Sequence, residues 1–266
     1  MGRTHPVNKA AILAMIDRLK ELYRGFPWES RVWKQKGTRR SPYRALILFG
    51  LSARTKDRLL VQMCDGFFRR FPKAGHLLDG WLDGDLDRLV RVGQKPFIES
   101  AVQVIGDNGG VIPPDKDGLK LIKGVGEKIA ECVIAYGWGG EALPLDGNGR
   151  RVVERVLGLA AGGPVHLLRG ALKDLYCSCR PWMEERGLAM VDLHELVRLH
   201  GQIVCTKAPK CSFCPVSTCR SRRAEHQKDS IPVVSQEFWR DWRELLLEPD
   251  SVNGRKDSAE EVSSTR

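Results

Sequence analysis

The chain has 266 residues, and its 43 lysines and arginines outnumber its 33 aspartates and glutamates, which gives a net charge of +10. A hydrophobic content of 42% excludes a wholly disordered chain, and no apolar run approaches the roughly 20 residues that span a bilayer. Residues 1–14 lack the apolar stretch of a signal peptide, so we expect a soluble cytoplasmic or nuclear protein whose basic body suits a polyanionic partner.

Helical periodicity accounts for most of the chain. Apolar residues recur at helical spacing over 8–24, and Ser41-Pro42 has the form of an N-cap and first helical position for a buried helix over 43–51. The basic, aromatic segment 25–41 is expected to be a loop. Further helices are predicted at 56–70, 85–92, 96–105, 165–176, 189–200 and 237–247, with three short segments between 115 and 157. Because no alternating strand pattern occurs, the expected fold class is all-α.

A glycine turn lies between two of the predicted helices, where residues 121–130 read Leu-Ile-Lys-Gly-Val-Gly-Glu-Lys-Ile-Ala. A Gly-x-Gly turn at Gly124, Val125 and Gly126 points backbone N–H groups outward. Such a nest binds phosphate without reading bases. Taken alone, the same residues fit an ordinary turn between helices.

Half of the eight cysteines cluster near the C-terminal end, at Cys205, Cys211, Cys214 and Cys219. In an intracellular chain such a cluster favours a metal site over disulfides. Four thiolates suit either a [4Fe–4S] cluster or tetrahedral zinc. The remaining cysteines show no partner pattern; they are Cys64, Cys132, Cys177 and Cys179.

Segment 112–157 resembles the helix-hairpin-helix-GPD DNA glycosylases, the superfamily of endonuclease III, adenine glycosylases and thymine-mismatch glycosylases. In that family the glycine hairpin is followed by a helix, an apolar stretch and an essential aspartate, here Asp146. Lys128 precedes Asp146 by eighteen positions, as in endonuclease III, while Lys123 replaces the hairpin's usual proline. The resemblance extends more loosely from about 8 to 220.

The resemblance implies that Lys128 is a nucleophile and Asp146 its partner. A lysine amine that attacks the anomeric carbon yields a Schiff base, from which the 3′ phosphate is eliminated. A nearby carboxylate stabilises the positively charged sugar and moves protons. The structural alternatives are a surface lysine and a helix N-cap.

The expected function is a bifunctional glycosylase and abasic-site lyase that removes a damaged pyrimidine and acts as a monomer. Its partner is double-stranded DNA that contains a damaged or mismatched base. One alternative is a monofunctional uracil or thymine mismatch glycosylase. The other is a DNA-binding protein of the same fold without catalysis.

Residues that surround the site differ between the subfamilies. Asp146-Gly147-Asn148 resembles the adenine glycosylases, but Phe49 stands where those enzymes need a glutamate, so adenine excision is disfavoured. By position, Arg54 and Gln94 would fill the gap that a flipped base leaves. The family more often has glutamine and leucine there, and exposed polar loop residues explain both equally well.

The cysteine loop follows His200-Gly201, much as the iron–sulfur loop follows a His-Gly in endonuclease III. Its spacing of five, two and four residues is shorter than the family's six, two and five. The resemblance implies a structural [4Fe–4S] cluster, with zinc as the competing metal.

Two lobes are expected, with the active site in the cleft between them. The first is a helical barrel over 42–155. The second combines 1–41 with 156–223 and holds the cysteine loop at 205–219. Residues 224–266 would form a partly disordered extension.

Overall fold

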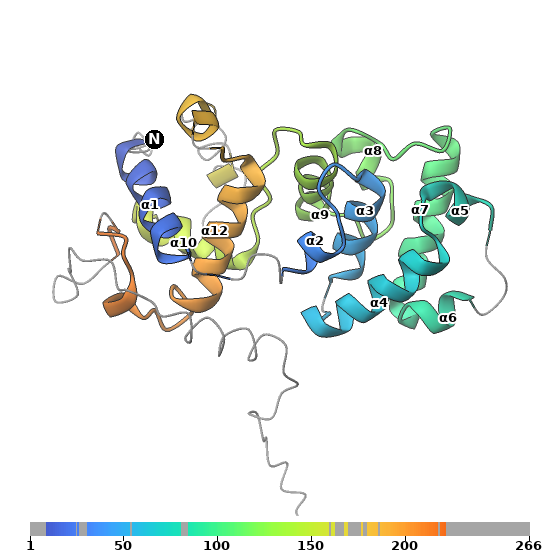
Figure 1. Cartoon of the computed structure of the whole chain (residues 1–266), viewed down its shortest axis with the longest axis horizontal. Helices are drawn as coiled ribbons and strands as arrows, with labels where there is room; N and C mark the ends of the chain where they lie inside the picture. The colour runs from blue at the N-terminus through green and yellow to red at the C-terminus, as the bar shows by residue number, and fades with distance from the viewer. Residues whose placement is uncertain are drawn as a thin grey trace, which may run out of the picture.

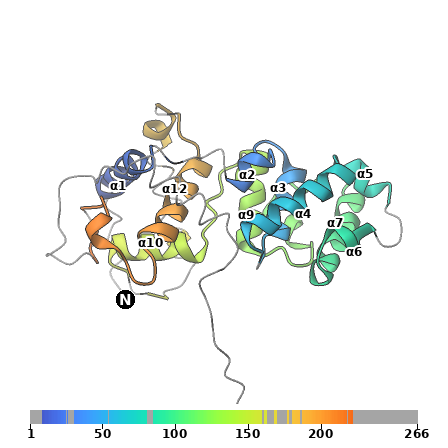
Figure 2. The ribbon, with the colours of Figure 1, turned by 60° about the horizontal axis from the view of Figure 1, so that its bottom comes forward.

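The structure is a computed structural model that describes residues 9–24, 26, 31–53, 55–80, 85–159, 161–162, 168–169, 177, 180–185, 187–217 and 219–221. Within these ranges every regular element is helical, which confirms the predicted fold class. The helices form two groups that lie side by side (Figures 1 and 2). None of the described helices has the length and apolar character needed to cross a membrane.

The larger group of helices surrounds α3 (Pro42–Leu51), which is apolar except for Arg44 and lies in the centre of its core. Ser41 is the N-cap of this helix and Pro42 its first residue, as predicted, although the Ser41 side chain makes no capping bond. The other members are α2 (Val32–Gln35), α4 (Asp57–Arg70), α5 (Ala74–Leu78), α6 (Asp85–Leu89), α7 (Lys95–Asp107), α8 (Lys116–Lys120), α9 (Glu127–Cys132) and its π-helical continuation η3 (Val133–Trp138).

The smaller group of helices has a separate core. It contains α1 (Lys9–Leu22), α10 (Gly147–Leu157) and α12 (Met190–Ile203), and α12 packs on both of the others. The crossing of α10 and α12 is close, since a Cβ atom on Gly201 would lie 2.5 Å from the carbonyl oxygen of Asn148. We call the two groups the barrel lobe and the second lobe.

Most of the predicted helices are confirmed; they are those at 8–24, 43–51, 56–70, 85–92, 96–105 and 189–200. The prediction of a loop over 25–41 was wrong in part, because α2 forms there. The five-residue helix α5 was not predicted. Both α2 and α5 are too short to show helical periodicity in the sequence. The predicted helix at 237–247 and the extension 224–266 lie outside the described residues, as does most of 165–176.

The lobe boundary also differs from the one expected from sequence. The range 42–155 assigns most of α10 to the barrel, whereas Val152, Val153 and Val156 of this helix pack into the core of the second lobe. An amphipathic pattern shows that a helix has a buried face, but it does not show which of two cores that face covers.

Candidate active site

The glycine turn connects α8 to α9, so a helix-hairpin-helix is present where the sequence predicted it. Gly124 has a φ of +87°, a left-handed conformation that favours glycine. Val125 is buried beneath the turn, while a Cβ atom on Gly124 or Gly126 would meet nothing within 4 Å. The turn therefore presents open backbone to solvent, which is what close approach to a phosphate requires.

Ion pairs join the two helices of the hairpin. Lys116 Nζ lies 3.0 Å from Glu127 and 3.3 Å from Glu131, and Lys120 Nζ lies 2.8 Å from Glu127. Hydrogen bonds from Lys120 and Lys116 lower the pKa of Glu127 to about 2. The two pairs of Glu127 are exposed on both sides and add little stability each, whereas Glu131 is buried.

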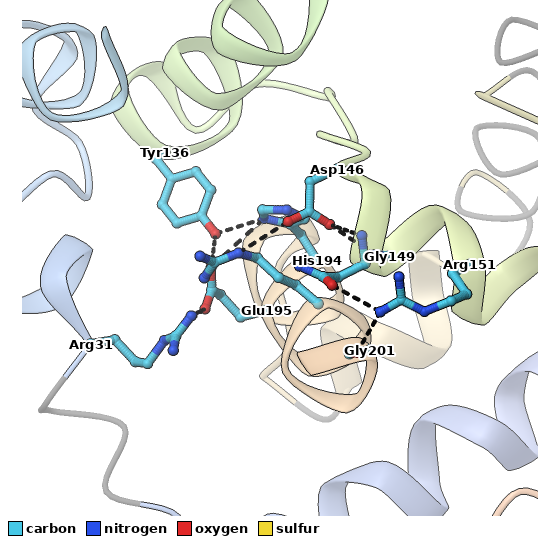
Figure 3. A network of polar contacts seen from close by, with 10 residues as sticks. Arg31, Tyr136, Asp146, Gly149, Arg151, His194, Glu195 and Gly201 are labelled. Carbon is cyan, nitrogen blue, oxygen red and sulfur yellow. Dashed lines mark hydrogen bonds and ion pairs between the residues drawn. The ribbon is translucent and has the colours of Figure 1, made fainter. Parts of the chain in front are cut away.

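Asp146 is the N-cap of α10, the structural role that the sequence left open. Its Oδ1 accepts backbone N–H bonds from Asn148 at 3.0 Å and Gly149 at 2.8 Å, and its Oδ2 lies 3.3 Å from Arg198 Nε of α12 (Figure 3). Burial alone would raise the pKa of this carboxyl, but the Gly149 bond and the Arg198 charge outweigh burial and lower it. Asp146 is therefore ionised at neutral pH.

Lys128 approaches Asp146 from the barrel lobe. It is exposed on α9, and its charge lowers the pKa values of Asp146, of His194 and of Cys132, the last of which burial raises to about 12. No ion pair joins Lys128 to Asp146 in the described part of the chain. The two residues therefore lie near one another, with Lys128 on α9 of the barrel lobe and Asp146 at the N-terminus of α10.

A buried acidic side chain, Glu195 of α12, lies beside Asp146 and ties the lobes together. It accepts a hydrogen bond from the Tyr136 hydroxyl at 2.8 Å and pairs with Arg31 at 3.1 Å and Arg198 at 3.6 Å (Figure 3). Burial raises the pKa of Glu195, but Arg31 and Arg198 outweigh burial and hold it at about 2. Arg198 therefore bridges two ionised carboxylates.

His194 completes this polar cluster. Its Nδ1 lies 2.8 Å from the Tyr136 hydroxyl, and its buried Nε2 has no hydrogen-bond partner among the described residues. Burial lowers the pKa of His194 to about 4, so the ring is neutral at neutral pH.

Sequence analysis missed this cluster of Arg31, Tyr136, His194, Glu195 and Arg198. The available signal was the pair His194-Glu195 within a helix whose residues are mostly buried. A buried charge needs a partner, but the pattern did not show where that partner lies.

The four clustered cysteines line one cavity of about 60 Å³. Arg155 of α10 donates to Cys205 Sγ at 3.4 Å and to the Thr206 carbonyl at 2.6 Å, while His200 Nε2 lies 3.4 Å from Cys214 Sγ. Among the described residues, no group of three or more histidine, cysteine, aspartate or glutamate side chains is arranged to hold a metal ion.

No family model matches the chain. It is similar to a thymine-DNA glycosylase of Aeropyrum pernix, with 27% identity over 223 residues that cover 79% of this chain and 95% of that protein. It is also similar to endonuclease III of Haemophilus influenzae, with 26% identity over 186 residues, 65% of this chain and 81% of that protein. A solved endonuclease III–DNA complex has the same fold, with a TM-score of 0.61, 20% identity, and coverage of 81% of this chain and 96% of that one.

The chain resembles proteins of the helix-hairpin-helix-GPD superfamily in sequence and has their fold. Four thiols are a donor set that a metal cluster would need, although the described side chains are not arranged around a metal position. The four thiols line one cavity, an N–H group of Arg155 donates to Cys205 Sγ, and His200 Nε2 lies within hydrogen-bond distance of Cys214 Sγ. The identity of the metal stays a prediction.

The predicted DNA-contact residues have different outcomes. Arg54 lies outside the described residues. Gln94 is buried, because its amide donates to the Leu51 carbonyl at 2.8 Å and accepts from the Arg91 backbone at 3.2 Å. Gln94 connects the segments of Leu51 and Arg91 and would have to leave these bonds to enter DNA, so its role there stays a prediction.

Two further features border the site. Phe49, which the sequence resemblance matches to a glutamate of adenine glycosylases, packs on Tyr136 with ring centroids 4.9 Å apart. A cavity of about 590 Å³ between α1, α2 and α12 is lined by Tyr23, Trp33 and Glu195, among others, but by neither Lys128 nor Asp146. This cavity touches the candidate site through Glu195.

Proposed function

We propose that this protein is a DNA glycosylase that removes a damaged or mismatched base from duplex DNA. The observation that carries the proposal is that Lys128, which follows the backbone-exposing hairpin on α9, lies near enough to Asp146 for its charge to lower the pKa of that carboxyl. In the comparisons, the protein from Aeropyrum pernix is named a thymine-DNA glycosylase and that from Haemophilus influenzae an endonuclease III.

In the bifunctional form of the proposal, the neutral amine of Lys128 attacks C1′ of a flipped pyrimidine nucleotide. The bond from C1′ to the base breaks, the base leaves with the bond's electron pair and takes up a proton, and Asp146 stabilises the positive sugar. Loss of a proton from nitrogen and opening of the sugar ring give a Schiff base. Removal of a C2′ proton then expels the 3′ phosphate by β-elimination. The hairpin at 124–126 holds the DNA backbone meanwhile.

A monofunctional mismatch glycosylase is the second candidate, and two relatives support it because they are named for the removal of thymine or uracil. Besides the Aeropyrum pernix protein, a protein of Pyrobaculum aerophilum named a thymine/uracil-DNA glycosylase is 25% identical over 213 residues, 76% of this chain and 87% of that protein. In this form Asp146 assists attack by water on the sugar, and Lys128 only adds positive charge. Removal of thymine or uracil would then leave the DNA strand intact.

We further propose that Cys205, Cys211, Cys214 and Cys219 hold a [4Fe–4S] cluster, with zinc as the alternative. When bound, the group would supply covalent cross-links that fix the loop. This chain's own residues connect the loop to the site, because Arg151 and Arg155 of α10 donate to loop carbonyls at 2.8 Å and 2.6 Å. The helix that they extend from is the one that Asp146 caps.

Borohydride trapping tests the proposal with duplexes that carry thymine glycol, uracil, a G·T mismatch or an abasic site. A covalent complex on a base lesion, lost in Lys128→Ala and kept in Lys73→Ala at an exposed lysine of the same lobe, would support the bifunctional form. Base release without trapping would support the monofunctional form. DNA binding without release of any base by the wild type, or release that persists in Asp146→Asn, would overturn the proposed chemistry.

A further inference from the structure

We propose that Arg198 is the positioning residue of this site, which orients the Asp146 carboxylate toward the sugar and keeps it charged while Lys128 reacts. The inference rests on the proposed function. Arg198 itself touches neither DNA nor base in this account; it acts through Asp146.

The geometry of Asp146 shows what Arg198 adds. The two backbone N–H bonds from α10 both end on Oδ1, so they hold one oxygen and leave the carboxylate plane to turn about it. Arg198 Nε faces the other oxygen, Oδ2, at 3.3 Å. With one oxygen held by α10 and the other by α12, both the plane and the exposed edge of the carboxylate are fixed.

Arg198 is held in turn by Glu195, whose Oε1 lies 3.6 Å from Nη1. That carboxylate is anchored by Arg31 at 3.1 Å and by the hydroxyl of Tyr136 at 2.8 Å, which come from the segment before α2 and from η3. A planar guanidinium contacts two carboxylates in a defined geometry, whereas a lysine ammonium is a point charge. Through Arg198 and Glu195, the Asp146 carboxylate is therefore connected to the barrel lobe, which carries Lys128.

The charges around Asp146 explain why a permanent cation is needed. The titratable groups that face it are Lys128 from α9 and His194 and Arg198 from α12, together with the N–H groups of α10. His194 is neutral at neutral pH, and Lys128 must lose its proton before it attacks the sugar. Arg198 cannot be deprotonated in a protein, so it is the cation among these three that remains beside Asp146 through the reaction.

The test compares single-turnover base release by Arg198→Gln, Arg198→Lys and wild type between roughly pH 4 and 9. Glu195 keeps Arg31 and Tyr136 in the glutamine variant, so the fold is retained. We expect the acidic limb of the Arg198→Gln profile to move up by about one pH unit, and its plateau rate to fall about tenfold with an unchanged Kd for DNA. Arg198→Lys keeps the positive charge but not the planar group, so the midpoint of its acidic limb should return most of the way to the wild-type pH, while its plateau rate recovers less.

Arg39→Gln is the matched control, since Arg39 pairs at 3.3 Å with Asp192 on the same helix and its loss also removes one guanidinium. Its profile should match the wild type. An Arg198→Gln limb identical to wild type, or a loss equal at every pH that tracks a lower Tm, would overturn the positioning role. Asp146→Asn distinguishes failure of the proposed function from failure of the positioning role of Arg198. If the wild type releases no base from any duplex, the proposed function is wrong. If Asp146→Asn is inactive while Arg198→Gln behaves as the wild type, only the positioning role is wrong.

Discussion

Gly201 is the point where α12 passes closest to α10, and Gly201→Ala tests whether that contact sets the active site. The new Cβ atom would lie 2.5 Å from the Asn148 carbonyl oxygen and 2.8 Å from its carbonyl carbon. Ordinary contact begins at 3.4 Å, so the helices must part by about 0.9 Å, the difference between 3.4 and 2.5. Both nearest atoms are backbone and cannot rotate away. We expect a loss of about 2–3 kcal/mol in the free energy of unfolding.

The same movement should affect catalysis. Asp146 caps α10 and Arg198 lies on α12, so separating these helices lengthens the contact between the two side chains. Displacements of this size cost on the order of a hundredfold in rate when they misplace a reacting group. For a chain of this length the stability loss corresponds to a fall of roughly 5–10 °C in Tm.

Calorimetry and single-turnover base release, measured on the same preparation, check both effects. Gly75→Ala in α5 is the control, because its Cβ atom would meet nothing within 4 Å; alanine is favoured over glycine in a helix by up to about 1 kcal/mol, so its Tm should stay at or above the wild-type value and its rate should be unchanged. A Gly201→Ala protein with wild-type Tm would refute the packing argument. A lowered Tm with an unchanged rate would show that the helix crossing does not position Asp146.

Three other predictions follow from single contacts. Gly124→Ala should lower the free energy of unfolding by about 1 kcal/mol, because its φ is +87°. Gly126→Ala should leave the free energy of unfolding unchanged. It should weaken the binding of undamaged duplex in a low-salt titration, since an added methyl keeps phosphate away from open backbone. The pKa of His194 is lowered to about 4, so the unfolded chain binds a proton before the folded chain does, and the free energy of unfolding should fall by about 3 kcal/mol as pH drops from 6.5 to 4. Urea titrations of His194→Gln should lack that part of the pH dependence. A pH dependence identical to that of the wild type would contradict the assignment. Purified protein should absorb visible light, and Cys211→Ser should lose that absorbance. A colourless protein that contains zinc would show that the bound metal is zinc and not an iron–sulfur cluster.

Local sequence determined a large part of this protein. Helical periodicity located the longer helices, and glycine spacing located the hairpin, because both depend on residues close together in the chain. The interval between Lys128 and Asp146 followed from a family pattern, and the structure brings both residues to one region. Four cysteines within one short loop predicted a shared site, and they line one cavity.

Only the tertiary structure decided which charged side chains pair in the site and into which of the two cores each helix packs. Glu195 meets Arg31 from 164 positions away, and no local pattern connects them. Asp146 is held by Arg198 because α10 and α12 cross at Gly201, and Gln94 turns inward because the Leu51 carbonyl is within reach. A buried charge must find a partner, but which partner it finds depends on the packing of distant segments.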